Sequence, residues 1–135
     1  MKLKNHTIIM YLNTLQKCAD MNLPAKLRFA IAKNMATLSN DYKIYAEELT
    51  KLYNKFGEKD DDGNLVQNEN NPIPNIKNEH KDIFGKEIAD LLNIEVDIDI
   101  HHVEESDLFF DDERYDIITP NNIVGLLDIL CEKKS

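Results

Sequence analysis

The chain has no tryptophan, only four glycines and four prolines, and two cysteines among 135 residues. So little glycine leaves no glycine-rich phosphate loop, and neither a G-x-S-x-G nor an H-E-x-x-H motif occurs. Paired carboxylates are common, but in so acidic a chain their pairing carries little information. We therefore expect a protein that is not an enzyme and needs no cofactor.

Cysteine is too scarce for a metal or redox motif. Cys18 and Cys131 lie far apart and belong to no Cys-x-x-Cys pair. Each lies among apolar residues of an expected helix, where a free cysteine behaves as a small hydrophobic side chain. We expect two buried, reduced thiols, and the alternative is a disulfide that joins the two ends of the chain.

Long hydrophobic runs are also missing. No run approaches the roughly 20 residues that span a bilayer, and no secretory signal follows the short run Ile8-Ile9-Met10. We expect a cytoplasmic protein without membrane contact. Its apolar content of 42% and charged content of 30% are those of a globular protein, and 135 residues suit a single domain, 1–135.

Basic charge is scarce in the second part of the chain. Residues 1–57 carry nine Lys/Arg and four Asp/Glu, whereas residues 58–135 carry seven Lys/Arg and twenty-one Asp/Glu. The net charge of the whole chain is -9. Such an acidic half repels nucleic acid, so a basic protein partner or a head-to-tail contact between copies fits better. The simpler alternative is that these carboxylates only keep the protein soluble. The expected partner-binding residues are Glu95, Asp97, Asp99, Glu104, Glu105, Asp107, Asp111, Asp112 and Glu113.

Two helices are expected in the basic half. Apolar residues recur at helical spacing over 5–20, and Pro24 then suits the first turn of a second helix that ends at Gly57. The apolar residues of this second helix alternate at spacings of four and three, as in a coiled-coil seam. We expect an antiparallel hairpin, with the remainder of the seam covered by C-terminal segments or by a second copy. The seam residues are Ile31, Met35, Leu38, Tyr42, Tyr45, Leu49, Leu52 and Phe56.

The acidic half alternates helix and strand. Residues 58–79 read as a polar loop or short hairpin, 80–92 as a helix, and 94–102 as a strand in which apolar and charged residues alternate. The strand needs a partner, and the candidates are residues 2–3, 65–66, 108–110 and 115–118. Thr119-Pro120 then begins a last helix that reaches Cys131. The fold class is α+β, mainly helical: a long N-terminal antiparallel helical hairpin (1–57), the loop (58–79) and a helix-strand-helix half (80–135).

One segment matches the twelve-residue frame of an EF-hand calcium loop. Asp62-Gly63 lies at the sharp turn of that frame. A glutamate stands where the first ligand is normally aspartate, and Asn70-Asn71-Pro72 replaces the start of an exiting helix, so an acidic turn is the simpler interpretation. We expect no metal site; the weak calcium candidates are Glu58, Asp60, Asp62, Asn64 and Glu69.

A second metal candidate is the pair His101-His102. Adjacent strand residues point to opposite faces, so the two imidazoles do not converge on one ion.

Three motifs resemble a family of small uncharacterised proteins from phages and prophages of low-GC Gram-positive bacteria. They are Leu23-Pro24-Ala25-Lys26-Leu27, Glu58-Lys59-Asp60-Asp61-Asp62-Gly63-Asn64, and Phe84–Leu92 running into Ile94-Glu95-Val96. The resemblance spans about three quarters of the chain, and these motifs are short. It brings no catalytic residues. What it implies is an early or accessory phage protein, of a kind that often binds and blocks a host factor.

The leading hypothesis is a non-enzymatic phage accessory protein that binds a host or phage protein through its acidic surface. Its sharpest version is the inhibition of a host defence factor, as an anti-CRISPR protein does. An oligomeric assembly or scaffolding factor that uses the helical seam is the first alternative. A small-ligand or nucleotide sponge is the second, because a pocket leaves no motif in the sequence.

Overall fold

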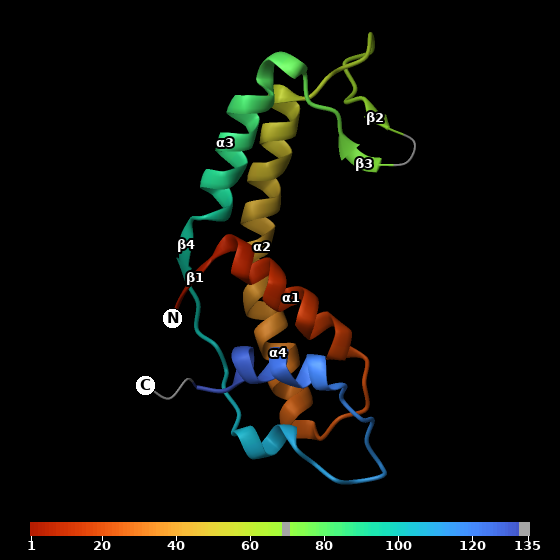
Figure 1. Ribbon diagram of the computed structural model, residues 1–135, viewed down its shortest axis with the longest axis vertical. Helices are drawn as coiled ribbons and strands as arrows, with labels where there is room; N and C mark the ends of the chain where they lie inside the picture. Colours follow the sequence, from red (N-terminus) through yellow and green to blue (C-terminus); the bar gives the residue numbers. More distant parts are fainter. Residues whose placement is uncertain (69–70, 133–135) are drawn as a thin grey trace. The chain divides into compact units, whose positions relative to one another are not determined.

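The computed structural model describes residues 1–68 and 71–132 (Figure 1). Within these ranges most residues are helical, and short antiparallel strand pairs accompany the helices. The mainly helical α+β class expected from the sequence is therefore confirmed. The α-helices are α1 (Asn5–Ala19), α2 (Ala25–Phe56), α3 (Lys81–Leu92) and α4 (Pro120–Leu130); the strands are β1 (Lys2–Lys4), β2 (Gln67–Asn68), β3 (Asn71–Pro74) and β4 (Glu95–Asp97).

The chain divides into two compact units. Unit 1 consists of Met1–Tyr42 and Glu95–Ser135, and unit 2 of Lys43–Ile94. The division falls inside α2, which gives its first part to unit 1 and its second part to unit 2, and not after residue 57. That the chain behaves as a single domain stays a prediction.

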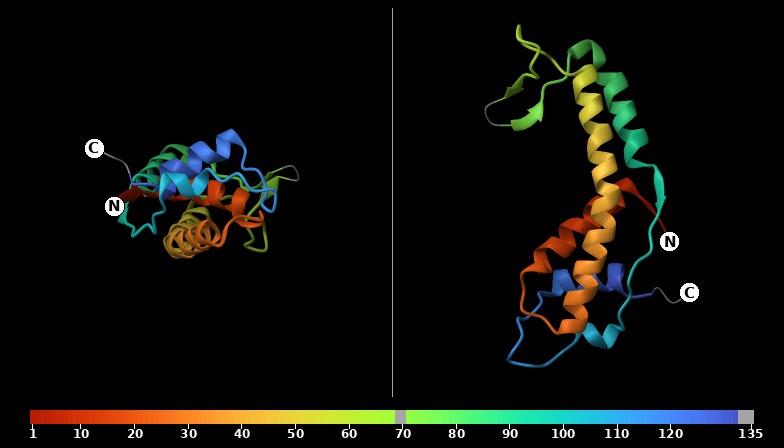
Figure 2. Two further views of the ribbon diagram at one scale, coloured as in Figure 1. Left: turned by 90° about the horizontal axis from the view of Figure 1, so that it is seen from below. Right: turned by 180° about the vertical axis from the view of Figure 1, so that it is seen from behind.

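In unit 1 the chain reverses direction between α1 and α2, and α1 crosses the first part of α2 obliquely (Figures 1 and 2). The buried face of α1 packs on α4 as well, because Ile8, Leu12 and Leu15 belong to one apolar core with Leu126 and Leu130. The α4 helix begins as the sequence predicts, with the Thr119 hydroxyl accepting the backbone N–H of Asn122 and proline following it. The residues of this core span α1, α2, α4 and the segment from 98 to 118.

The expected strand over 94–102 is shorter in the structure. Only Glu95–Asp97 form β4, which pairs antiparallel with β1, so the sequence candidate Lys2-Leu3 is the correct partner. The following apolar residues Ile98 and Ile100 are still buried in alternation with exposed residues, and Val103 is buried as well. Their segment makes isolated hydrogen bonds to groups of other elements and does not pair with a strand. The β-ladder therefore ends at Asp97.

A buried asparagine of α2 holds this extended segment. The Asn34 side chain is 0% exposed, its Nδ2 donates to the carbonyl of His101 at 2.9 Å, and its Oδ1 accepts the His101 N–H at 2.8 Å. The amide thus pairs with the backbone as a neighbouring strand would. Two backbone bonds flank it: Ile98 N–H to the Met1 carbonyl and Val103 N–H to the Leu130 carbonyl, each 2.8 Å long.

Unit 2 is a hairpin of helices with a β-hairpin beside it. The second part of α2 and the antiparallel α3 lie side by side (Figures 1 and 2). The Phe84 ring of α3 lies 5.4 Å from Tyr53 and 6.2 Å from Phe56, between ring centroids. In this unit Tyr45, Phe56 and Leu91 are buried. The β2 and β3 strands then pair antiparallel, with an irregular register at Gln67/Asn68.

The acidic sequence 60–62 forms a tight turn. The Oδ1 of Asp60 accepts the backbone N–H groups of Asp62 and Asn64 at 3.0 and 2.9 Å, and Gly63 has φ +82°, a left-handed conformation that favours glycine. A bridge between Lys59 and Leu65 closes the turn. The predicted turn at Asp62-Gly63 is confirmed, within a short hairpin.

Candidate functional site: an acidic loop with an apolar pocket

The loop from 108 to 118 follows a short 3-10 helix (Glu105–Leu108) and is fixed to the connection between α1 and α2. Asn22 makes this attachment. Its Nδ2 donates to the Arg114 carbonyl at 2.6 Å, and its backbone N–H donates to the Asp116 carboxylate at 2.8 Å. The Asp116 N–H in turn donates to the Asn22 carbonyl at 2.8 Å. The 108–118 loop therefore has one defined path at this point, where the side chains of Arg114 and Asp116 are exposed.

Several of the predicted acidic residues have structural partners. An oxygen of Asp107 lies 3.1 Å from Lys26 Nζ and accepts the Glu104 N–H at 3.0 Å, and Glu104 completes the same capping box. The hydrogen bond from Lys26, and then the one from Glu104, lower the pKa of Asp107. These two carboxylates hold the 3-10 helix that leads into the loop.

Asp112 also belongs to the structural group. Its carboxylate accepts the Arg114 guanidinium, with Nη2 at 2.6 Å and Nε at 3.0 Å, and the Arg114 backbone N–H at 3.0 Å. The Arg114 guanidinium, followed by that backbone N–H, lowers the pKa of Asp112 to about 2. The pair also raises the pKa of Arg114. The one base of residues 95–116 is thus already bound within the loop.

The remaining acidic residues of the predicted set are exposed. Asp97 lies 4.0 Å from the N-terminal ammonium group, at the limit of an ion pair. To residues in 1–68 and 71–132, the others make neither an ion pair nor a side-chain hydrogen bond. They are Glu95, Asp99, Glu105, Asp111 and Glu113.

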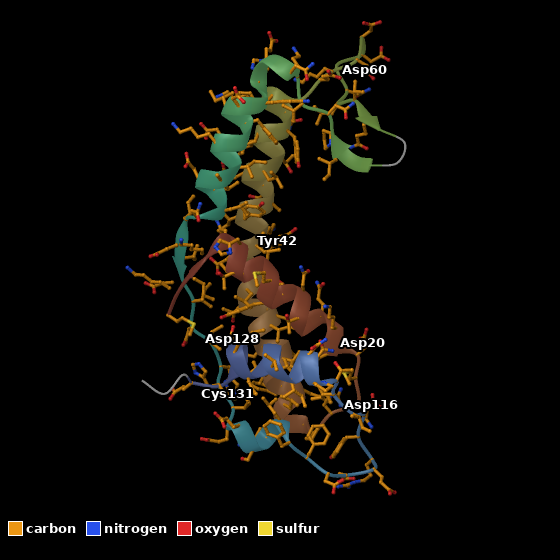
Figure 3. All side chains as sticks on the ribbon, in the orientation of Figure 1. Asp20, Tyr42, Asp60, Asp116, Asp128 and Cys131 are labelled. Carbon is orange, nitrogen blue, oxygen red and sulfur yellow. The ribbon has the colours of Figure 1, made fainter. Side chains whose placement is uncertain are left out.

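Exposed apolar side chains accompany these carboxylates. Ile117 is 89% exposed and Phe109 is 60% exposed, although both neighbour residues that are buried in the core. The loop also surrounds a pocket of about 560 Å³, within the usual range for binding pockets. Figure 3 labels Asp116 on this loop. The pocket is lined by Leu108, Phe109, Phe110, Asp111, Asp112, Glu113, Tyr115, Asp116, Ile117, Ile118 and Ile123.

The predicted seam on α2 is divided between the two units. Ile31 and Leu38 are buried in the unit 1 core with Met35 packed on it, whereas Tyr45 and Phe56 are buried in unit 2. Leu49 and Leu52 are half-buried, and Tyr42 is 40% exposed. C-terminal segments therefore cover much of the seam, and a second copy is not needed for that purpose. Self-association stays a prediction.

The calcium candidates do not form an EF-hand. Asp60 uses its carboxylate within the turn, and strand β3 occupies the place where the exiting helix would begin. Of the other candidates, Glu58, Asp62 and Asn64 belong to the same hairpin, and Glu69 lies outside the described residues. Across ranges 1–68 and 71–132, His, Cys, Asp and Glu form no group of three or more that could hold a metal ion.

The two adjacent histidines diverge. The His101 ring meets Phe29 edge-on at 5.2 Å, whereas His102 Nδ1 lies 3.9 Å from the Glu132 carboxylate. They do not share a ligand position.

The two cysteines are free and buried, as the first interpretation expects, and the alternative disulfide is absent. Burial raises the pKa of both thiols, and at Cys18 the charge of Lys17 partly opposes this effect. Neither sulfur is therefore a reactive thiolate at neutral pH.

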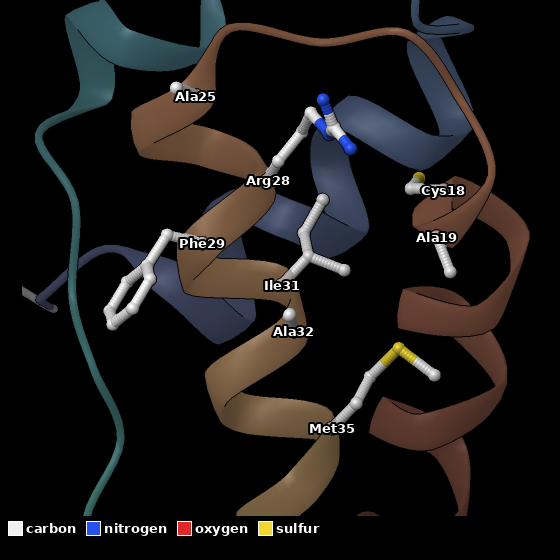
Figure 4. A pocket seen from close by; sticks show the side chains of 8 residues that line it. All are labelled: Cys18, Ala19, Ala25, Arg28, Phe29, Ile31, Ala32 and Met35. Atoms are coloured by element: carbon white, nitrogen blue, oxygen red, sulfur yellow. The ribbon is translucent and has the colours of Figure 1, made fainter.

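A second hollow lies in unit 1 between α1 and the first part of α2. It has a volume of about 360 Å³ (Figure 4). We call it the α1–α2 groove. Sequence reasoning did not find it, nor the exposure of Phe109 and Ile117, because apolar residues in a sequence are expected inside. Its lining residues are Cys18, Ala19, Ala25, Arg28, Phe29, Ile31, Ala32 and Met35.

Comparisons with family models, with curated proteins and with solved structures give no match to this chain. In the described ranges, no helix combines the length and the apolar character needed to cross a membrane.

Proposed function

We propose that this chain is a non-enzymatic binding protein that docks on a basic protein partner through the 108–118 loop and the free carboxylates near it. One observation supports the proposal above the others: Phe109 and Ile117 are exposed beside the free acidic residues Asp111 and Glu113. Solubility alone accounts for exposed carboxylates, but it does not account for large apolar side chains among them.

The two kinds of side chain have different roles in docking. Burial of an exposed isoleucine or phenylalanine provides about 1.5–3 kcal/mol, which makes these residues the anchors of a contact. The carboxylates attract a basic surface and raise the association rate, and their effect is weakened by salt. A partner of this kind has a basic surface that normally takes nucleic acid or another polyanion.

The biological setting that we propose is a phage accessory protein, with a host defence factor as the partner. The short motifs that resemble phage and prophage proteins support this setting. An assembly or scaffolding role through the α2 seam is the alternative.

The test begins with a tagged pull-down from nuclease-treated lysate of a low-GC Gram-positive host. The protein that is recovered is then purified, and its binding to variants of this chain is measured. Reversal of Glu105, Asp111 and Glu113 to lysine should lower the association rate at least tenfold, since these carboxylates are exposed and carry no structural bond. Reversal of Asp112 would confuse the result, because that carboxylate holds Arg114.

A matched control keeps the same total charge. The triple reversal of Asp82, Glu87 and Asp90 on α3 changes the net charge by the same amount in unit 2. We expect this control to bind nearly as the original chain does. Equal loss of binding in both triple variants would show that binding depends only on net charge and not on the loop, which would contradict the docking proposal. Unchanged binding in the loop variant would also overturn it.

A further inference from the structure

The α1–α2 groove is separate from the 108–118 loop and has a different chemistry. Its floor consists of Cys18 and Ile31, both buried, and small alanine side chains at Ala19 and Ala32 keep the space above them open. The loop pocket has four carboxylates in its lining, whereas the α1–α2 groove has one charged residue, Arg28.

Arg28 makes this groove amphiphilic. Figure 4 shows its side chain extending from α2 toward the α1–α2 connection, while Ile31 and Met35 point toward α1. To the part of the chain that the structure describes, the Arg28 guanidinium makes no ion pair and no hydrogen bond. The net charge of the chain is -9, yet the Arg28 guanidinium lies at the end of an apolar space without a carboxylate partner in the described residues.

The chain segment that lines the groove is basic, whereas unit 1 also contains the acidic residues 95–116. Residues 1–42, which contain all the lining residues, carry six Lys/Arg and two Asp/Glu. Lys17 lies next to Cys18 on α1, and its charge acts on that thiol. The two acidic residues of this segment are Asp20 and Asp41. Asp20 is exposed, directly follows α1 and forms no ion pair with Arg28.

The dimensions select the size of the ligand. Arg28 and Met35 are seven residues apart on α2, so they are separated by about 10 Å along the helix axis. With carbon–carbon bonds of about 1.5 Å in a zigzag, an aliphatic carboxylate of about eight carbons has that length. A volume of about 360 Å³ lies at the low end of the range for small-molecule sites.

We propose that the α1–α2 groove binds a small amphiphilic anion, namely an aliphatic carboxylate whose head pairs with Arg28 and whose chain lies over Ile31 toward Met35. A guanidinium recognises a carboxylate with two parallel hydrogen bonds. The chain covers the apolar floor, as it does in sites lined mainly by apolar side chains. This site does not depend on the docking role of the 108–118 loop.

The probe is octanoate, with octanol as its neutral counterpart and octylamine as its cationic one. Binding is followed by amide chemical shifts in NMR, which report affinity and position together. We expect saturable shifts at the lining residues with octanoate, weaker shifts with octanol and none with octylamine. Salt should weaken octanoate binding and leave octanol binding unchanged.

Two variants with matched controls locate the site. Arg28→Gln should weaken octanoate binding by about threefold to fivefold, as expected for an exposed ion pair, and remove the preference over octanol. Lys33→Gln removes the same charge from an exposed position of α2 outside the groove and should have no effect. Ala32→Leu fills the groove and should weaken binding more than tenfold, whereas Ala36→Leu, one turn further on, should not.

All four positions are exposed, so the variants should keep the fold, which circular dichroism checks. Three results would overturn the proposal: no saturable shift with octanoate, equal binding of octanoate and octanol, or an equal effect of Ala32→Leu and Ala36→Leu.

Discussion

Replacement of Asn34 by alanine tests how unit 1 holds the segment after β4. This asparagine lies in the first third of α2, where its side chain is fully buried and bonds both backbone groups of His101, at 2.8 and 2.9 Å. In the described residues, no buried side-chain nitrogen or oxygen lacks a partner. The variant leaves a backbone donor and a backbone acceptor without their partner.

The magnitude follows from these two bonds. Each intramolecular hydrogen bond contributes about 1 kcal/mol net, and a buried group left without a partner costs about 1–3 kcal/mol. The His101 side chain is exposed, so water reaches part of this site, and the lower values apply. Alanine favours the helix over asparagine by about 0.6 kcal/mol, which offsets part of the loss. We expect Asn34→Ala to lower the free energy of unfolding by about 1–2 kcal/mol.

Urea denaturation followed by circular dichroism measures this change, and hydrogen exchange of the His101 amide locates it. Asn40→Ala is the matched control, because Asn40 is an exposed asparagine of the same helix, and its replacement should raise stability by up to about 0.6 kcal/mol. A loss below about 1 kcal/mol at Asn34, or an unchanged exchange rate of the His101 amide, would refute the role given to this side chain.

Other changes test unit 2 and the loop. Gly57→Ala should destabilise the protein by about 1–3 kcal/mol, because the new Cβ would lie 2.5 Å from the Tyr53 carbonyl oxygen. Gly85→Ala meets open space in α3 and should stabilise it by about 0.5–1 kcal/mol; chemical denaturation compares the two, and the opposite order would contradict this structure. Because the folded pKa of Asp112 is about 2, below its ordinary value of about 3.9, its pairing with Arg114 stabilises the loop above about pH 4 and is lost as pH falls toward 2. Arg114→Gln should raise that pKa toward the ordinary value, and a carboxyl titration by NMR that shows no change would exclude Arg114 as the cause.

Helices were predictable from the sequence because their signals are local. The spacing of Ile8, Leu12 and Leu15 requires only that one face be buried, and Thr119-Pro120 marks a helix start wherever the helix packs. Strand length was less predictable. The alternation after Glu95 continues to Ile100, but a strand ends where its partner ends, and β1 has only three residues. Beyond β4, the buried Asn34 side chain of α2 bonds the backbone of His101 in place of a strand. No sequence pattern predicts such a bond.

The α2 seam shows a second limit of sequence patterns. Its four-three spacing predicts one continuous apolar face, whereas in the structure Tyr42 is 40% exposed and Leu49 and Leu52 are half-buried. The spacing does not tell which elements cover it, and the first part is covered in unit 1 while Tyr45 and Phe56 are buried in unit 2. Coverage depends on contacts between residues far apart in the chain.

The acidic surface could be located from composition, but composition could not tell which of its carboxylates have structural bonds and which are exposed without one. A carboxylate that caps a turn and one that faces solvent look the same in a sequence, and only coordinates separate Asp107 and Asp112 from Asp111 and Glu113. The separation also strengthens the docking interpretation. Because the structural carboxylates and Asn22 already fix the path of the 108–118 loop, the docking that we propose at Ile117 would require less ordering of the backbone. An anchor presented on an ordered loop binds more tightly than the same side chain on a free segment, so in the docking that we propose the internal bonds of the acidic surface would support the contacts of its exposed groups.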